Sequence, residues 1–218
     1  MSYVQTSAAA IADEGGSLAM RLVALTASRL CHDLVSPLGA IGNGVELLEM
    51  TGAPARLDDS AEWSLIGDAL RVAQGRIEFF RMAFGQAGRT QRVSHAEFAA
   101  LIAQMEQAGR LRITLEPGED QARATVRMVL LALMCIETAM PWGASVAIRQ
   151  TGQGWQIDAQ AGRTRDNPVL WAWLDGVDPG RPDPAASEVQ FPLLALAAQE
   201  MGRRINWSLG AEAARISF

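Results

Sequence analysis

A strongly basic composition and long apolar runs are both missing from this chain of 218 residues. Its formal net charge is -5 and its isoelectric point is about 5.1, so we do not expect it to bind nucleic acid, which attracts basic surfaces. No apolar run reaches the roughly 18 residues that a membrane-spanning helix needs. The segment 1–16 also lacks the basic and then apolar pattern of a secretory signal, and we expect no membrane contact.

Cysteine and histidine are scarce, with two residues of each type. Cys31 and Cys135 lie in apolar, helical contexts, which indicates reduced core thiols rather than a disulfide and fits a cytoplasmic location. The histidines and cysteines are far apart in the sequence and have none of the spacings of a zinc site. We therefore predict no metal site.

Hydrophobic residues make up 49% of the chain and charged residues 20%, which is ordinary for a globular protein of one large or two small domains. The pattern divides the chain into a flexible N-terminus (1–16), a helical hairpin (17–86) and a second domain (92–218). A polar linker separates the last two. The predicted fold class is α+β.

A long helix is predicted from about Ser17 to Met50, because apolar residues recur at helical spacing on one face. His32 lies about 160° around this helix from Leu30 and from Leu34, and it should therefore point into solvent. The residues that form the apolar face are Leu30, Leu34, Ile41, Val45 and Leu48.

The interior of this helix is unusual. Pro37 removes the hydrogen bond to the Asp33 carbonyl, at a cost of about 3 kcal/mol, and each interior glycine costs about 1 kcal/mol. Close packing in a bundle would compensate for these losses. The alternative is that the helix ends near Ala40 and a glycine loop follows. The apolar face continues in phase beyond this point and favours the bundle. The glycines are Gly39, Gly42 and Gly44.

A second helix should follow a turn at 51–54, opening on the acidic residues of 58–60 and ending near Gly85. The two helices then form an antiparallel hairpin. One hairpin cannot bury two apolar faces by itself, whereas two hairpins can form a four-helix bundle. We therefore predict a homodimer.

The second domain alternates between helical and strand patterns, which predicts a sheet with helices on one face, an α/β sandwich. A loop is expected over 162–184, in which Trp171 and Trp173 belong either to a partner-binding surface or to the core. We expect helices over 94–107, 122–139 and 191–201, a β-hairpin of 145–149 and 155–159, and strands over 111–115, 204–209 and 213–218.

The stretch from Leu30 to Pro37 resembles a known family of signalling proteins. Its letters H-D-L-V-S-P resemble the phosphoacceptor box of bacterial histidine kinases, and the wider C-H-D-L-V-S-P-L-G-A-I-x-N-G-x-E-L-L-E resembles the ChpT-type histidine phosphotransferases. The resemblance implies that His32 accepts a phosphoryl group from an aspartate of a receiver domain and passes it to another response regulator.

The second domain resembles the ATP-binding domain of histidine kinases, but residues that bind the nucleotide there are absent. The positions of the two magnesium-binding asparagines fall on Leu131 and Cys135, which offer no oxygen ligands. The adenine motif reads Asp158-Ala159-Gln160-Ala161-Gly162. The glycine-rich phosphate loop is replaced by 187–193, which lacks glycine. The resemblance therefore implies a degenerate ATPase-like domain without nucleotide or other cofactor.

The chemistry of transfer assigns roles to residues around His32. Histidine is the side chain that presents a neutral nitrogen near neutral pH. Asp33 would hydrogen-bond the other ring nitrogen and fix the tautomer, and Arg29 would pair with phosphoryl oxygens. Ser36 occupies the position where kinases with phosphatase activity orient water. Mg²⁺ is expected to come with the receiver domain.

Short side chains below His32 offer a shallow strip on which a receiver domain could dock. We predict that the strip consists of Ser28, Val35, Gly39 and Asn43.

Two other functions stay open at this point. The chain would be a sensor kinase fragment if it bound ATP and phosphorylated itself, or a noncatalytic scaffold if it bound a receiver without taking phosphate. Single residues also have alternative, nonfunctional roles. Asp33 could be an ordinary surface acid and Arg29 a surface cation, and His95 a structural residue at the start of a helix.

Overall fold

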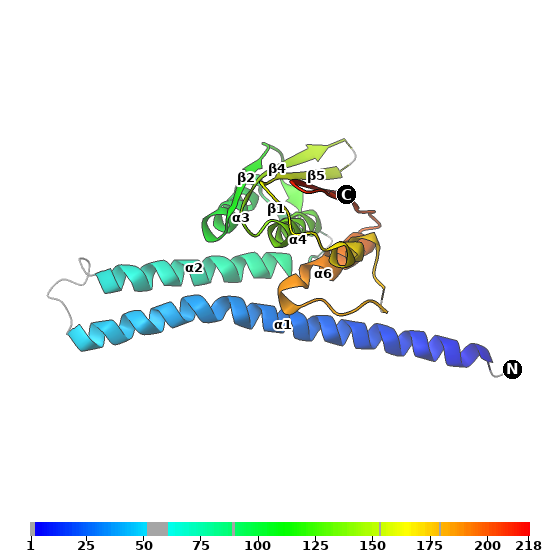
Figure 1. Cartoon of the computed structure of the whole chain (residues 1–218), viewed down its shortest axis with the longest axis horizontal. Helices are drawn as coiled ribbons and strands as arrows, with labels where there is room; N and C mark the ends of the chain where they lie inside the picture. Colours follow the sequence, from blue (N-terminus) through cyan, green and yellow to red (C-terminus); the bar gives the residue numbers. More distant parts are fainter. Residues whose placement is uncertain (1–2, 52–60, 89, 153, 179) are drawn as a thin grey trace.

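The computed structural model describes residues 3–51, 61–88, 90–152, 154–178 and 180–218. Its N-terminal half is an antiparallel hairpin of α1 (Tyr3–Thr51) and α2 (Ala61–Ala83), shown in Figure 1. The prediction that the helix continues past Ala40 is confirmed, with Pro37 inside it. The predicted turn and the acidic start of the second helix lie outside the described residues.

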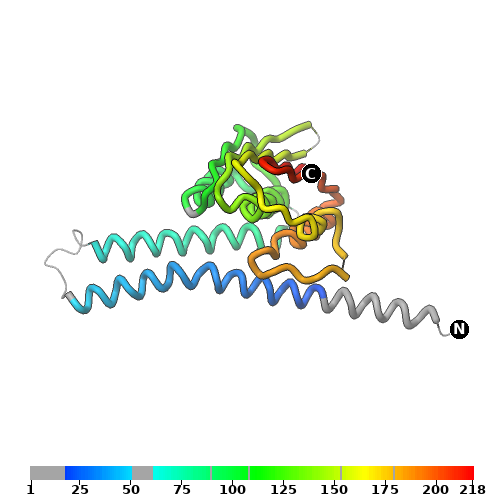
Figure 2. The backbone as a smooth tube through the Cα atoms, viewed as in Figure 1, coloured from blue at the N-terminus to red at the C-terminus, as the bar shows by residue number. Residues whose placement is uncertain are grey.

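The first helix begins earlier than the sequence pattern indicates. It starts at Tyr3 rather than Ser17, because the segment before Ser17 is rich in alanine, the residue with the highest helix propensity. Figure 2 shows the main-chain path of the hairpin.

Close packing between α1 and α2 explains a glycine that would otherwise weaken the helix. A Cβ atom on Gly44 would lie 2.6 Å from Cγ1 of Ile66, too close for any side chain there. Pro37 is also buried in the hairpin. The predicted close helix packing is therefore confirmed at Gly44 and Pro37, whereas a Cβ atom on Gly39 or Gly42 would meet no atom within 4 Å.

The C-terminal half is built around a five-stranded sheet with the order β2-β4-β5-β7-β6. Strands β2 and β4 are parallel and the other neighbours are antiparallel. A separate antiparallel pair, β1 and β3, was not predicted. The strands are β1 (Arg92–Val93), β2 (Leu111–Leu115), β3 (Gln121–Ala122), β4 (Ala144–Thr151), β5 (Gly154–Gln160), β6 (Asn206–Leu209) and β7 (Ala213–Ser217).

Helices lie on one side of this sheet, between it and the hairpin (Figure 1). The most deeply buried is α4, whose apolar side chains from Val126 to Ile136 have almost no solvent exposure. The helices of this half are α3 (His95–Ala108), α4 (Arg123–Ala139), α5 (Pro168–Trp171) and α6 (Gln190–Glu200), with 3₁₀ turns η2 (Ala172–Asp175) and η3 (Ala186–Glu188). The predicted α+β fold is confirmed.

Part of the expected loop 162–184 is helical. The Asn167 side chain accepts a hydrogen bond from the main-chain nitrogen of Leu170 and so caps α5. This turn places Trp171 and Trp173 in the core, where they are 1% and 2% exposed. The core alternative for this tryptophan pair is therefore correct.

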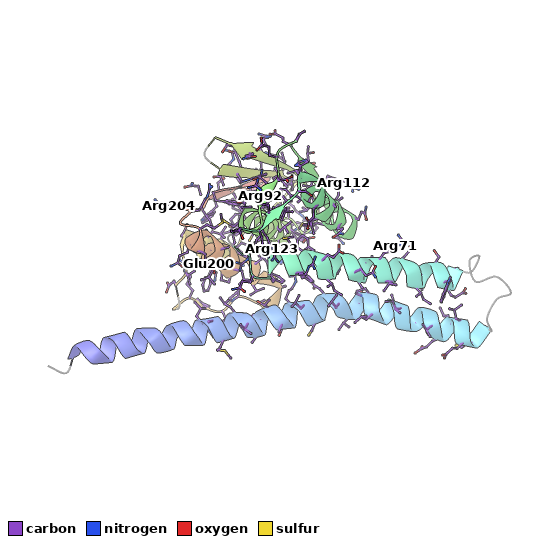
Figure 3. The ribbon with its side chains drawn as sticks, turned by 180° about the vertical axis from the view of Figure 1, so that it is seen from behind. Arg71, Arg92, Arg112, Arg123, Glu200 and Arg204 are labelled. Atoms are coloured by element: carbon purple, nitrogen blue, oxygen red, sulfur yellow. The ribbon has the colours of Figure 1, made fainter. Side chains whose placement is uncertain are left out.

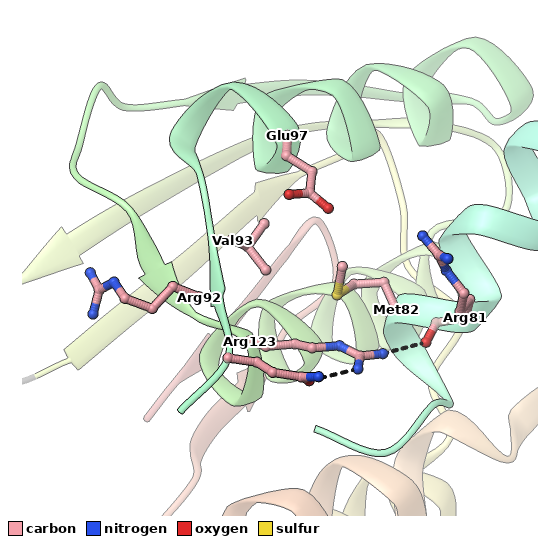
Figure 4. Close-up of a pocket in the computed structure, with 7 residues that line it drawn as sticks. Arg81, Met82, Arg92, Val93, Glu97 and Arg123 are labelled. Carbon is pink, nitrogen blue, oxygen red and sulfur yellow. Dashed lines mark hydrogen bonds between the residues drawn. The ribbon is translucent and has the colours of Figure 1, made fainter. Parts of the chain in front are cut away.

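One arginine fastens the C-terminal half to the end of α2. Nη1 of Arg123 donates to the Gln86 carbonyl (2.7 Å) and to Oε1 of Gln91 (2.9 Å), and Nη2 donates to the Arg81 carbonyl (2.9 Å). Figure 4 shows this arginine in the wall of a cleft of about 490 Å³. The positive charge of Arg123 is favourable at the carbonyl end of α2, so we assign this arginine a structural role.

Beyond this junction the hairpin extends on its own. Figure 3 shows Arg71 on the part of α2 that projects past the C-terminal half.

Candidate functional site

His32 lies on α1 with its side chain 86% exposed, as the helical pattern predicted. Its Nδ1 atom lies 3.0 Å from Oδ1 of Asp33. A carboxylate can only accept in this pair, so the geometry favours the tautomer with the proton on Nδ1. The unprotonated nitrogen is then Nε2, in a ring that is open to solvent.

Asp33 is itself held in place, with only 10% of its side chain exposed. Nε of Arg29 donates to Oδ2 of Asp33 over 2.6 Å, and Nη1 of Arg76 lies 3.7 Å from the same oxygen. Because both arginines lie on the Oδ2 side, Oδ1 is left for the imidazole of His32. Asp33 is therefore no ordinary surface acid.

Arg76 also compensates for Pro37. Pro37 has no N–H group, so the Asp33 carbonyl lacks its usual helical donor. Nη1 of Arg76 lies 3.3 Å from this carbonyl oxygen and donates to it. Sequence reasoning identified the lost bond but missed Arg76, because nothing in a local pattern tells which residue of α2 faces Asp33.

Arg29 connects the site to the C-terminal half. Its Nη1 donates to the main-chain carbonyl of Ser187, 2.7 Å away. Glu137 of α4 is close enough to be influenced by Arg29, Arg76 and Asp33, although its burial is the larger effect and raises the pKa of its carboxyl. Sequence reasoning missed Ser187 and Glu137 as neighbours of the histidine, since more than a hundred residues separate them from it.

The predicted docking residues are all exposed. These are Ser28, Val35, Gly39 and Asn43, and Ser36, for which a different role was predicted, is exposed as well. A Cβ atom on Gly39 would meet no atom within 4 Å, so a larger side chain fits there without disturbing the helix. Whether a receiver domain contacts these residues, and whether Arg29 meets a phosphoryl group, stay predictions.

Cys31, next to His32, differs from its prediction. It is exposed, whereas Cys135 is buried and burial raises the pKa of its thiol. The reason is helical phase: Cys31 lies about 100° around α1 from Leu30, which contacts the core. Both cysteines are free.

The structure places the residues that the resemblance to kinases aligns with nucleotide-binding positions. Leu131 and Cys135 are fully buried in the core. Asp158 pairs with Arg149 and Arg215 (3.6 and 2.5 Å) and alternates with buried residues of β5, so it faces away from the helices. Within the described ranges, no cluster of His, Cys, Asp and Glu could hold a metal ion. None of the described helices has the length and apolar character needed to cross a membrane.

Comparisons with known proteins agree with this architecture. Residues 95–213 match the family model of the histidine phosphotransferase C-terminal domain. The protein phosphotransferase ChpT of Brucella abortus (strain 2308) is 32% identical over 200 residues, which cover 89% of this chain and 93% of that protein. A bacterial phosphotransferase of known structure superposes with a TM-score of 0.71 at 29% identity, covering 91% of this chain and 96% of the other. The chain therefore belongs to the ChpT-type histidine phosphotransferase family.

Proposed function

We propose that this protein carries phosphoryl groups on His32 between receiver domains of a bacterial phosphorelay. The observation that supports this most directly is the exposed imidazole with Asp33 on its Nδ1 atom, in a chain of the histidine phosphotransferase family. Such a protein is an intermediate carrier, and its phosphate comes from an aspartyl phosphate rather than from ATP.

The proposed transfer is a displacement at phosphorus. The Nε2 lone pair of His32 attacks, a P–N bond forms, and the P–O bond to the receiver aspartate breaks and leaves a carboxylate. The proton stays on Nδ1, where Asp33 stabilises the positive ring through the hydrogen bond. In the second transfer the carboxylate of another receiver attacks, and the P–N bond breaks.

The receiver supplies the remaining groups in this proposal. Mg²⁺ bound to the receiver neutralises the phosphoryl oxygens, together with a receiver lysine, a residue type that this sequence does not contain. The protein itself then needs no resident cofactor. Residues Leu131 and Cys135, buried where a kinase holds magnesium, support this view.

Receiver domains of a hybrid kinase and of response regulators are the proposed partners. They would dock on the strip of short side chains beside His32, formed by Ser28, Val35, Gly39 and Asn43, with the exposed Ser36 next to it. Such relays operate in the cytoplasm, where the two free cysteines would stay reduced.

A homodimer is also part of the proposal. Leu38 and Val45 of α1 are 57% and 42% exposed, and Leu65 and Val72 of α2 are 42% and 45% exposed. Leu38 and Val45 directly follow Pro37 and Gly44, which are buried in the hairpin, and therefore lie about 100° around α1 from them. A second hairpin packed there would bury these side chains in a four-helix bundle and leave His32 outside.

The test is transfer of label from a phosphorylated receiver domain. We expect an acid-labile label on the wild-type chain and none on His32→Gln. Binding of the receiver without label on the wild type would favour a scaffold instead. Label from ATP, together with micromolar binding of a fluorescent nucleotide, would instead favour a kinase. A label that persists in the His32→Gln variant would place the phosphoryl group elsewhere.

A further inference from the structure

A buried glutamine lies at the far end of the contacts that begin at His32. Gln190, the first residue of α6, is 1% exposed, and among the described residues it is the one polar side chain in the buried core. Buried amides cost free energy unless they are hydrogen-bonded. Its partners therefore indicate what it does.

The amide nitrogen of Gln190 has three acceptors, of which the Met134 carbonyl, 3.5 Å away, is the most distant. Nε2 donates to the Ser187 carbonyl over 3.0 Å and to Oγ1 of Thr138 over 2.7 Å. Thr138 uses its own hydroxyl proton on the Met134 carbonyl (3.0 Å), so its oxygen can only accept from Gln190. Because all of these groups accept, the –NH₂ end of the amide must point at them, which fixes its orientation.

The Ser187 carbonyl joins this amide to the phosphotransfer site. It accepts from Gln190 and also from Nη1 of Arg29, at 2.7 Å. Arg29 in turn holds Asp33 at 2.6 Å, and Asp33 lies 3.0 Å from Nδ1 of His32. An unbroken series of hydrogen bonds thus runs from α4 and α6 to the histidine. We call it the Gln190 network.

The network restrains a side chain that is otherwise flexible. Arginine has several rotatable bonds and loses much rotamer freedom when it is held. With Nη1 on Ser187 and Nε on Asp33, Arg29 is fixed at two atoms. Figure 1 shows the segment before α6 lying against α1, so the C-terminal half can hold Arg29 only while this segment keeps its position.

One further feature indicates that the Gln190 amide is present for its hydrogen bond to the Ser187 carbonyl. Oε1 of Gln190 is buried and accepts no hydrogen bond from the described residues. A leucine of similar size would fill the same space without an unpaired oxygen. Packing alone therefore does not explain the glutamine.

We propose that Gln190 is a positioning residue for phosphotransfer, which acts through Ser187, Arg29 and Asp33 to hold the imidazole of His32 in one tautomer. This rests on the proposed function in assuming that His32 takes the phosphoryl group. The C-terminal half then serves the reaction by orienting the histidine from a distance.

The experiment compares Gln190→Leu with wild type in two measurements. One is the initial rate at which phosphoramidate, a small phosphoryl donor that needs no docking surface, phosphorylates His32. The other is the ratio of His32 ring tautomers, measured by ¹⁵N NMR. We expect the rate to fall about twofold to tenfold, as for the loss of one hydrogen bond, and the Nδ1–H tautomer to decrease.

One further variant is the control, and another is a second test of the network. Gln199→Leu makes the same change at an exposed position of α6 and should behave like wild type. Thr138→Val removes one acceptor of the amide and should change both measurements in the same direction as Gln190→Leu. It therefore tests the network even if Gln190→Leu folds poorly.

The result that would overturn the inference is an unchanged rate and tautomer ratio in both Gln190→Leu and Thr138→Val. If the wild-type chain takes no phosphoryl group at all, the proposed function fails. The tautomer ratios of the variants still decide the role of Gln190 in that case.

Discussion

Nη1 of Arg76 lies 3.3 Å from the main-chain oxygen of Asp33, the carbonyl that Pro37 leaves without a helical donor. The proline and the arginine belong to different helices, and the arginine supplies the hydrogen-bond donor that the proline removes. Pro37 loosens the helix just after His32, and Arg76 restores the missing bond from α2.

This pairing predicts coupled effects on stability. Arg76→Met should lower the free energy of unfolding by about 1–3 kcal/mol, because it leaves the Asp33 carbonyl without a donor. In a Pro37→Ala background the restored N–H group replaces that donor, and the same change should cost less. Urea unfolding of the four proteins measures the coupling, and strictly additive effects would show that the arginine does not serve this carbonyl.

Asp33→Asn should slow phosphorylation of His32 by on the order of a hundredfold. An asparagine amide can donate to Nδ1 and so stabilise the tautomer that protonates the attacking nitrogen. Phosphoramidate labelling gives the rate. Asp68→Asn, which removes an exposed carboxylate bonded to Arg71, is the matched control. Equal rates for both variants would contradict the orienting role of Asp33.

Gly39→Glu and Ser36→Arg should block transfer from a receiver domain while leaving phosphoramidate labelling intact. Gly39 has open space around it, so the larger side chain obstructs a partner rather than the fold. We expect receiver affinity to weaken by at least about tenfold, equivalent to about 1.4 kcal/mol. Gly162→Glu places the same side chain in open space on the C-terminal half and should transfer normally. Normal transfer by both strip variants would mean that the docking face lies elsewhere.

Leu38→Asp should convert the proposed dimer into a monomer, because a carboxylate would be buried between the two hairpins without a partner. Light scattering after size exclusion measures the mass. Val169→Asp changes another strongly exposed apolar residue, 63% exposed on α5, and should leave the mass unchanged. A wild-type protein that is already monomeric would remove the dimer from the proposal.

Glu137 predicts a pH dependence of stability. Burial raises its pKa above the ordinary 4.5, despite Arg29 and Arg76. The folded state therefore binds this proton more tightly than the unfolded state, and the resulting stabilisation is complete below about pH 4.5 and lost as the pH rises through the raised pKa. The unfolding free energy of wild type minus that of Glu137→Gln should fall over this range. Urea unfolding at a series of pH values measures this difference. Glu119→Gln, at an exposed position, is the control. A difference between wild type and Glu137→Gln that rises with pH would contradict the prediction.

Much of the site was predictable because it depends on helical phase. Leu30 packs against the core, and from it the exposure of His32 follows by rotation around one helix. The prediction for Cys31 was wrong because it was made from the apolar neighbours of Cys31 and not from helical phase. Phase, rather than neighbouring composition, decided where that side chain points.

The sequence by itself determined the continuous helix through Pro37, the exposed histidine, the acid beside it and the buried leucine and cysteine of the second domain, since all of these depend on local spacing and residue type. Only the tertiary structure decided that Arg76 serves the Asp33 carbonyl and that Arg29 reaches Ser187 and, through it, Gln190. These contacts join residues up to 158 positions apart, and no local period encodes which distant side chains meet when two domains pack together.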